Sequence, residues 1–170
     1  MKRKIYNKLL EWKAEEGKRA LLIEGARRIG KSWIVEEFAK TEYGENNYLM
    51  IDFSKISIDG KQLFDRYLDD LDNFFLYLFE YYGVHLKERA GLIIFDEVQE
   101  FPRAREAIKH LVKDGRFDYI ETGSLISIKK NTKDILIPSE EHSIKMYPMD
   151  FEEFLWAYNR PDLMDIIRLH

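Results

Sequence analysis

The chain has 170 residues, of which 45% are hydrophobic and 14% aromatic, enough to bury the core of one soluble globular domain. Its formal net charge of −4 argues against wholesale binding to nucleic acid or to an anionic membrane, because both need a basic face. The lack of cysteine excludes disulfides and cysteine-based metal sites, and no stretch approaches the roughly 18 apolar residues of a membrane span. We therefore expect a cytoplasmic protein with no membrane partner.

Helices and strands are expected to alternate along the chain. Apolar residues at helical spacing predict an N-terminal helix that ends at Gly17. Short apolar runs predict buried strands at 19–24, 47–53, 91–97 and 118–124, and a weaker strand at 143–147. Helical patterns occupy 31–42, 61–82 and 102–113. This alternation implies parallel strands with crossover helices, so we predict an α/β fold: a three-layer αβα domain with a mainly parallel five-stranded sheet.

Residues 25–32, GARRIGKS, fit the phosphate-loop pattern G-x-x-x-x-G-K-[ST], known as Walker A, between a predicted strand and a predicted helix. The glycines would let the backbone wrap a phosphate, and the start of the helix adds its partial positive charge. Lys31 would reach the β and γ phosphates, and the Ser32 hydroxyl would ligate Mg²⁺. The predicted nucleotide-binding set is Gly25, Ala26, Arg27, Arg28, Ile29, Gly30, Lys31, Ser32 and Trp33. Arg27 and Arg28 are expected to face solvent.

A second motif, LIIFDE, ends a hydrophobic strand with two acids, at the strand end where α/β sheets bind ligands. Asp96 would hold the Mg²⁺ shell, and Glu97 would act as the general base for an attacking water. Glu97 favours hydrolysis over phosphotransfer. Gln99 is left open between orienting the water or a neighbouring loop and a surface role.

The fourth strand ends in ETGS. If it lies between the strands of the first two motifs, Thr122 or Ser124 would meet the γ phosphate or the water as a polar sensor. For either residue alone, a local turn around Gly123 is an equal alternative.

Adenine is a better prediction than guanine for the base. The stretch NTKD, 131–134, has the residues of a guanine-specificity motif in the wrong order, and DEVQ lacks the glycine that GTPases place after their metal-binding aspartate. The aromatic pattern within 61–82 is interpreted as a core face, with one edge available to a partner.

The motifs GARRIGKS, IIFDEVQ, ETGS and above all KMYPMDFEEFLWA resemble those of the AAA-like ATP-binding proteins of bacteria and archaea. The resemblance covers nearly the whole chain. It implies an additional-strand P-loop NTPase with ATP and Mg²⁺ as cofactors, followed by a C-terminal domain described as restriction-nuclease-like. By the same matching, Lys31, Glu97 and Thr122 or Ser124 are the implied catalytic residues, and Ser32 and Asp96 the metal ligands.

The chain also departs from this pattern. No arginine occurs between Arg116 and Arg160 to serve as an AAA-type finger, and Lys129, Lys130 and Lys133 lack the planar fork of arginine. We expect residues 1–147 to form the ATPase core and 148–170 to begin a helical region, with Asp150 as cap and Glu153 three residues later. We therefore expect the chain to be the N-terminal part of a longer protein.

Two functions remain open. The first is Mg²⁺-dependent ATP hydrolysis that drives a conformational change in a C-terminal domain or partner. The alternative is a nucleotide-regulated module with negligible turnover that binds protein or DNA. The sequence leaves the oligomeric state open.

Overall fold

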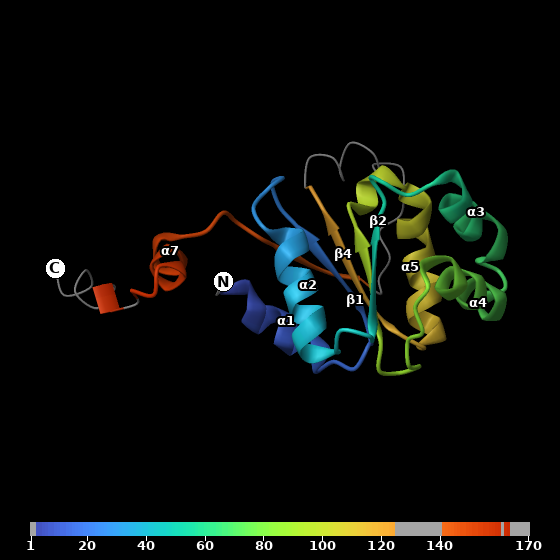
Figure 1. The fold of residues 1–170 in the computed structure, drawn as a ribbon, viewed down its shortest axis with the longest axis horizontal. Helices are drawn as coiled ribbons and strands as arrows, with labels where there is room; N and C mark the ends of the chain where they lie inside the picture. Colours follow the sequence, from blue (N-terminus) through green and yellow to red (C-terminus); the bar gives the residue numbers. More distant parts are fainter. Residues whose placement is uncertain (1–2, 125–140, 161, 164–170) are drawn as a thin grey trace.

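The computed structural model describes residues 3–124, 141–160 and 162–163. Its centre is a five-stranded sheet in the order β2-β3-β4-β1-β5, and every neighbouring pair is parallel (Figure 1). The strands are β1 (Ala20–Glu24), β2 (Tyr48–Asp52), β3 (Leu92–Asp96), β4 (Asp118–Gly123) and β5 (Glu141–Lys145). The predicted α/β fold and sheet are confirmed. The condition set for the candidate sensors is met, because β4 lies between β1 and β3, the strands of the first two motifs.

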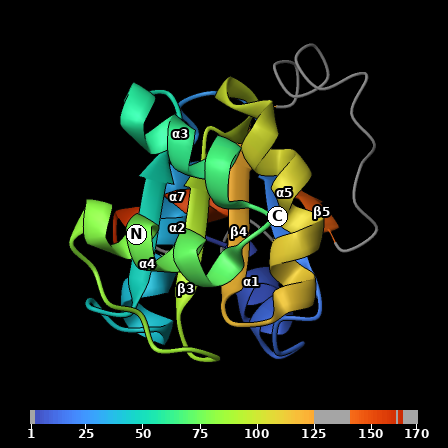
Figure 2. The ribbon, with the colours of Figure 1, turned by 90° about the vertical axis from the view of Figure 1, so that its right-hand side faces the viewer.

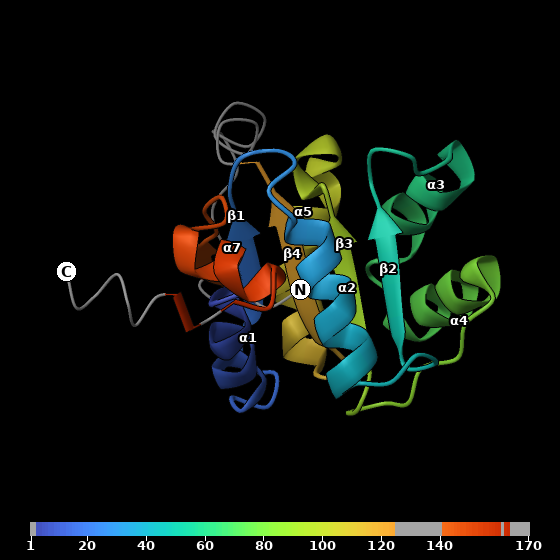
Figure 3. The same ribbon diagram turned by 60° about the vertical axis from the view of Figure 1, so that its left-hand side comes forward.

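Helices cover both faces of the sheet. On one face lie α1 (Ile5–Lys13) and α2 (Lys31–Glu42), and on the other α3 (Ile58–Tyr67), α4 (Leu71–Tyr82) and α5 (Pro102–Asp114). Figure 2 shows α3, α4 and α5 in front of the sheet. A short 3-10 helix, η1 (Val98–Glu100), follows β3, and α7 (Phe151–Ala157) follows β5 and lies near α1 and α2 (Figure 3). Among the described residues, no helix has the length and apolar character needed to cross a membrane.

Alternation along the strands decides which side chains meet which helices. Leu21, Ile23 and Ile94 pack in the core under α1 and α2, whereas their neighbours Leu22 and Phe95 pack in the core under α3, α4 and α5. The same alternation sends Asp96 and Thr122 to the α2 face at the carboxyl ends of their strands. It sends Glu121 to the α5 face.

The predicted helix at 61–82 is wrong as a single element, because the chain breaks between α3 and α4. Asp70 caps α4 by accepting a bond from the Asn73 backbone N–H at 3.5 Å. A continuous helix over that range would be about 33 Å long at about 1.5 Å per residue. A five-residue strand spans only about 17 Å. The break lets Phe64 and Phe74 enter one core, with ring centroids 5.1 Å apart.

The fifth strand begins and ends two residues earlier than the predicted 143–147. Its register is set by β1, since Ala20 pairs with Glu141 and Glu24 with Lys145. The predicted helix start after it is confirmed, because Asp150 and Glu153 form a reciprocal capping box. The domain boundary after residue 147 stays a prediction, and Lys129, Lys130, Lys133 and the NTKD stretch lie outside the described residues.

Three buried ionisable side chains join β4, β5 and α5. Arg105 donates from Nη2 to Glu141 Oε1 at 2.8 Å, and both side chains are at most 2% exposed. Glu121 is fully buried beside them, and neither of its carboxyl oxygens has a hydrogen-bond partner that would suit a charged carboxylate. Burial raises the pKa of Glu121 well above its ordinary value, and the neighbouring Glu141 carboxyl raises it further, while Arg105 opposes the rise. Burial and the neighbouring Glu141 carboxyl thus favour the protonated form of Glu121 in the folded protein.

This protonation makes stability depend on pH. Above the ordinary carboxyl pKa of 4.5 the unfolded chain releases the Glu121 proton while the folded protein keeps it. The free energy of unfolding should therefore fall as pH rises toward the folded pKa, by up to about 1.4 kcal/mol per pH unit for one proton. Glu121→Gln should remove this contribution to the slope in urea denaturation between pH 5 and pH 8. Glu11→Gln, on the exposed side of α1, is the matched control and should keep it. Equal slopes in wild type and Glu121→Gln would contradict the assignment.

Candidate functional site

The loop of residues 25–32 joins β1 to α2 at the carboxyl edge of the sheet. Ala26, Arg27 and Arg28 are exposed, as predicted for the two arginines, and Arg27 comes within 3.9 Å of Glu100. Trp33, in the first turn of α2, is 42% exposed. The segment predicted to bind a nucleotide is therefore accessible from solvent.

Each glycine of the loop has a structural reason. Gly30 caps α2 with φ of 95°, a left-handed conformation that side chains rarely adopt. A Cβ added at Gly25 would lie 2.5 Å from the carbonyl oxygen of Met146. The first glycine is thus required by the close approach of the chain after β5, a contact between segments too far apart in the sequence to be foreseen from it.

Lys31 is buried on the inner side of the loop, at 4% exposure. Its Nζ donates to the carbonyl oxygens of Gly25 at 3.0 Å and Ala26 at 2.5 Å. Burial lowers the pKa of Lys31, while the charges of Glu97 and Asp96 raise it. The ammonium therefore lies beside two acids and bonds to the loop itself.

One carboxylate oxygen of Asp96 accepts hydrogen bonds from two hydroxyl groups. Ser32 Oγ donates to Asp96 Oδ1 at 2.7 Å, and Thr122 Oγ1 donates to the same oxygen at 2.5 Å. Burial raises the pKa of Asp96, and these two hydrogen bonds oppose the rise by stabilising the charged form. The structure thus brings together predicted residues from α2, β3 and β4.

Glu97 turns the chain directly after β3, with φ of 56°. Its backbone N–H donates to Thr122 Oγ1 at 3.1 Å, and its Oε2 accepts from Gln99 Nε2 at 2.6 Å. Gln99 is 1% exposed, so a surface role for it is wrong. The amide of Gln99 orients the carboxylate that was predicted to act as the base.

The two candidate sensors differ in their contacts. Thr122 contacts both Asp96 and Glu97 and fixes the turn between them. Ser124 is buried just beyond β4, and its sensor role stays a prediction.

Sequence reasoning missed Asp52, at the end of β2. It pairs in register with Asp96 on the neighbouring strand, and its charge adds to the rise in the pKa of Asp96. A signal is present in the sequence, because NYLMIDF also ends a buried strand with an acid. That signal points to the site only once β2 is known to lie beside β3.

A magnesium ion fits the donor set of this site. Ser32 and Asp96 offer a hydroxyl and a carboxylate, and Mg²⁺ commonly binds one or two protein oxygens together with substrate phosphates and water. Across residues 3–124 and 141–160, no group of three or more His, Cys, Asp or Glu side chains could hold a metal ion. A protein-only metal cage is therefore not formed by these residues.

A cavity of ≈ 340 Å³ lies between α1, α2 and α7. Trp33 and Trp156 both line it, together with Arg3, Tyr6 and Ile34. Two indole side chains, one of them in the first turn of α2, provide apolar surface at this cavity for a flat ring system.

Comparisons with known proteins agree with this fold. Solved structures similar to the chain include PCH-2 of C. elegans, with a TM-score of 0.48 and 14% identity over 99% of this chain and 48% of that one. Another is the Pif1 helicase of Candida albicans, with a TM-score of 0.50 and 11% identity over 94% of this chain and 42% of that one. The chain thus spans less than half of each of these structures. At 11% identity, the similarity to the Pif1 helicase shows the fold alone. No curated protein matches it.

The family comparison covers most of the chain. A family model described as "AAA domain" matches residues 17–155, which include the loop, β3 with its two acids, β4, β5 and most of α7. The match extends over far more than half of the sequence. The chain therefore belongs to the AAA domain family.

Proposed function

We propose that this domain binds MgATP and hydrolyses it. The observation that carries the proposal is the convergence of Ser32 and Thr122 on one oxygen of Asp96, beside a buried lysine at the start of α2. Membership of the AAA domain family supports nucleotide binding and ATPase activity.

Binding would begin at the loop and the N-terminus of α2. Backbone N–H groups and the helix dipole favour a polyphosphate there. Lys31 would exchange its bonds to the carbonyl groups of Gly25 and Ala26 for the phosphate oxygens. A triphosphate would also offset the effect of burial, which lowers the pKa of this lysine.

The metal would be held by Ser32 and Asp96. When bound, Mg²⁺ supplies positive charge that neutralises the phosphate oxygens and orients them. Asp96 is suited to this role, because its two hydrogen bonds favour the ionised form in spite of burial.

Hydrolysis would use Glu97 as the general base. Its carboxylate would accept a proton from a water whose oxygen attacks the γ phosphorus, and the bond from that phosphorus to the β–γ bridging oxygen would break. The products are ADP and inorganic phosphate. Thr122 keeps Glu97 in place through the backbone N–H, and Gln99 fixes the orientation of its carboxylate.

The base of the nucleotide would enter the cavity beside Trp33. Flat aromatic rings stack on indole faces, and Trp156 from α7 lines the same cavity. Adenine remains the proposed base.

One observation favours the second candidate, a nucleotide-regulated module for a protein or DNA partner or for a C-terminal domain. The carboxylate of Glu97 is already bonded to Gln99 at 2.6 Å, which would slow its use as a base. In such a module, bound ATP would order a surface with negligible turnover.

Lys31→Ala should weaken MgATP binding roughly 10- to 150-fold, the equivalent of the 1.5–3 kcal/mol that a hydrogen bond to a charged group contributes. Isothermal calorimetry measures the affinity, and circular dichroism checks the fold. Lys40→Ala, in the same helix but paired with Glu36 on its surface, is the control and should bind as wild type does. Unchanged affinity in folded Lys31→Ala would exclude the loop as the phosphate site.

Glu97→Gln should keep the MgATP affinity but slow phosphate release by roughly 10²–10⁴-fold, the contribution of a positioned base. Single-turnover phosphate release, in the chain together with any domain attached to it, makes the comparison. Glu106→Gln is the matched control, because Glu106 is exposed on α5 and pairs with Arg103. If wild type and Glu97→Gln show the same residual rate while both bind MgATP, the nucleotide-regulated module is the better description.

Trp33→Ala should weaken MgATP binding by roughly 5- to 150-fold, because stacking of a base on an aromatic ring contributes about 1–3 kcal/mol. The affinity for magnesium tripolyphosphate, which lacks the base, should stay the same. Calorimetry with both ligands separates the two contributions. An equal loss for both ligands would show that Trp33 supports the loop and not the base.

A further inference from the structure

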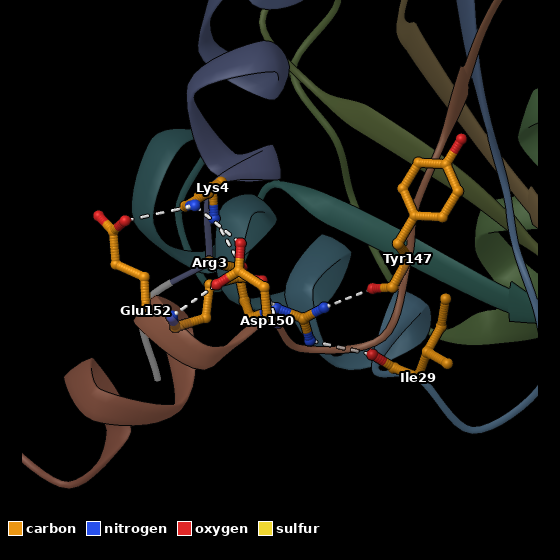
Figure 4. A network of polar contacts seen from close by, with 7 residues as sticks. Arg3, Lys4, Ile29, Tyr147, Asp150 and Glu152 are labelled. Carbon is orange, nitrogen blue, oxygen red and sulfur yellow. Dashed lines mark hydrogen bonds and ion pairs between the residues drawn. The ribbon is translucent and has the colours of Figure 1, made fainter. Parts of the chain in front are cut away.

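Arg3, just before α1, joins three segments that are far apart in the sequence. Its Nη1 donates to the carbonyl oxygen of Ile29 in the loop at 3.0 Å, and its Nη2 to the carbonyl oxygen of Tyr147 at 2.9 Å (Figure 4). Its Nε donates to Glu153 Oε2 in α7 at 2.9 Å. One side chain therefore ties the loop, the chain after β5 and α7 together.

The guanidinium is buried, and so is its acid. The side chains of Arg3 and Glu153 are 4% and 8% exposed. Glu153 Oε2 also accepts the backbone N–H of Lys4, while its Oε1 accepts that of Asp150 in the capping box. Buried ion pairs depend on such complete hydrogen bonding, and loss of one partner leaves an uncompensated charge. The docked position of α7 is thus specified by this pair.

On the loop side, Arg3 holds the carbonyl group between two left-handed residues. Arg28 has φ of 64° and Gly30 φ of 95°, so Ile29 lies in a tightly curved backbone. A Cβ at Gly30 would come within 3.3 Å of Arg3 Nη1, which indicates that the guanidinium also packs against the loop. Left-handed backbone at a non-glycine residue persists where the surroundings enforce it. Arg3 supplies part of that enforcement.

We propose that Arg3 is a positioning residue that couples the shape of the nucleotide-binding loop to the docking of α7. The inference rests on the proposed function. With α7 docked, Glu153 orients the guanidinium, and the guanidinium holds the Ile29 carbonyl group so that the loop keeps its curve. Because coupling free energies are reciprocal, a nucleotide in the loop must stabilise docked α7 by the same factor. The nucleotide state is thereby transmitted to the chain after β5.

Arg3→Lys removes the fork of donors but keeps the positive charge. We expect its MgATP dissociation constant to rise at least about fivefold, the lower end of typical coupling between sites. Glu11→Gln is the control. The Glu11 side chain lies on the exposed side of α1, so MgATP affinity should not change.

Hydrogen exchange supplies the readout that a merely structural residue would not alter. Phe154 and Tyr158 donate their amide protons within α7, to the carbonyl groups of Asp150 and Phe154. Saturating MgATP should slow the exchange of these two amides at least about fivefold in wild type and in Glu11→Gln. In Arg3→Lys that protection should disappear, although the loop amides are still protected by the ligand.

Glu153→Gln keeps a side-chain oxygen near Arg3 but removes the negative charge of Glu153. It provides a second test of the coupling if Arg3→Lys does not fold. It should also lose the protection of α7. The coupling is wrong if folded Arg3→Lys or Glu153→Gln binds MgATP with wild-type affinity and shows the same protection of α7. A wild-type chain that does not bind MgATP, or that binds it equally after Lys31→Ala, would instead overturn the proposed function and this inference with it.

Discussion

The two hydrogen bonds received by Asp96 Oδ1 are the constraint on which the rest of the site depends. A buried carboxylate is costly unless donors face it, and here the donors are hydroxyl groups from α2 and from β4. Ser32 can reach the carboxylate only if the loop turns directly from β1 into α2. Thr122 can reach it only if β4 lies beside β3. The strand order, the shape of the loop and the start of α2 are therefore all required to bring the two hydroxyl groups to Asp96.

Those parts of the fold that depend on local signals could be predicted from the sequence. Continuous apolar runs indicated the strands, Pro102 and Gly115 bounded α5, and Asp150 with Glu153 indicated the start of α7. The meeting of Ser32 and Asp96 was also predictable, because parallel strands bring their carboxyl ends to one edge and each motif places its polar residues directly after a strand. In each case the partners are neighbours in sequence or are related by a general rule of parallel sheets.

The parts that could not be predicted depend on partners with no such relation. The chain breaks after α3 because the strands of the sheet are short compared with a helix over 61–82. The apolar periodicity of 61–82 fits a single helix as well as two. The residues around Glu121 predict a strand whichever face of the sheet Glu121 lies on. Its burial beside Glu141 could therefore be recognised only once the position of β5 was known. Arg3 bonds to Glu153, which is 150 residues away in the sequence. The basic residues around Arg3 give no signal of this contact. Asp52 became recognisable only through its register with Asp96.

Packing between the loop and the segment after β5 explains why Gly25 and Glu153 are needed. The usual explanation of Gly25 is access of the backbone to phosphate, yet a Cβ there would first collide with the carbonyl oxygen of Met146. Met146 is held at that place, because its N–H continues the β5 ladder by donating to Glu24 at 2.7 Å. Beyond it, Glu153 both closes the capping box of α7 and binds Arg3, whose other nitrogens return to the loop. The loop and the PMDFEEF segment thus form one packed unit, so a substitution in either must be judged by its effect on the other.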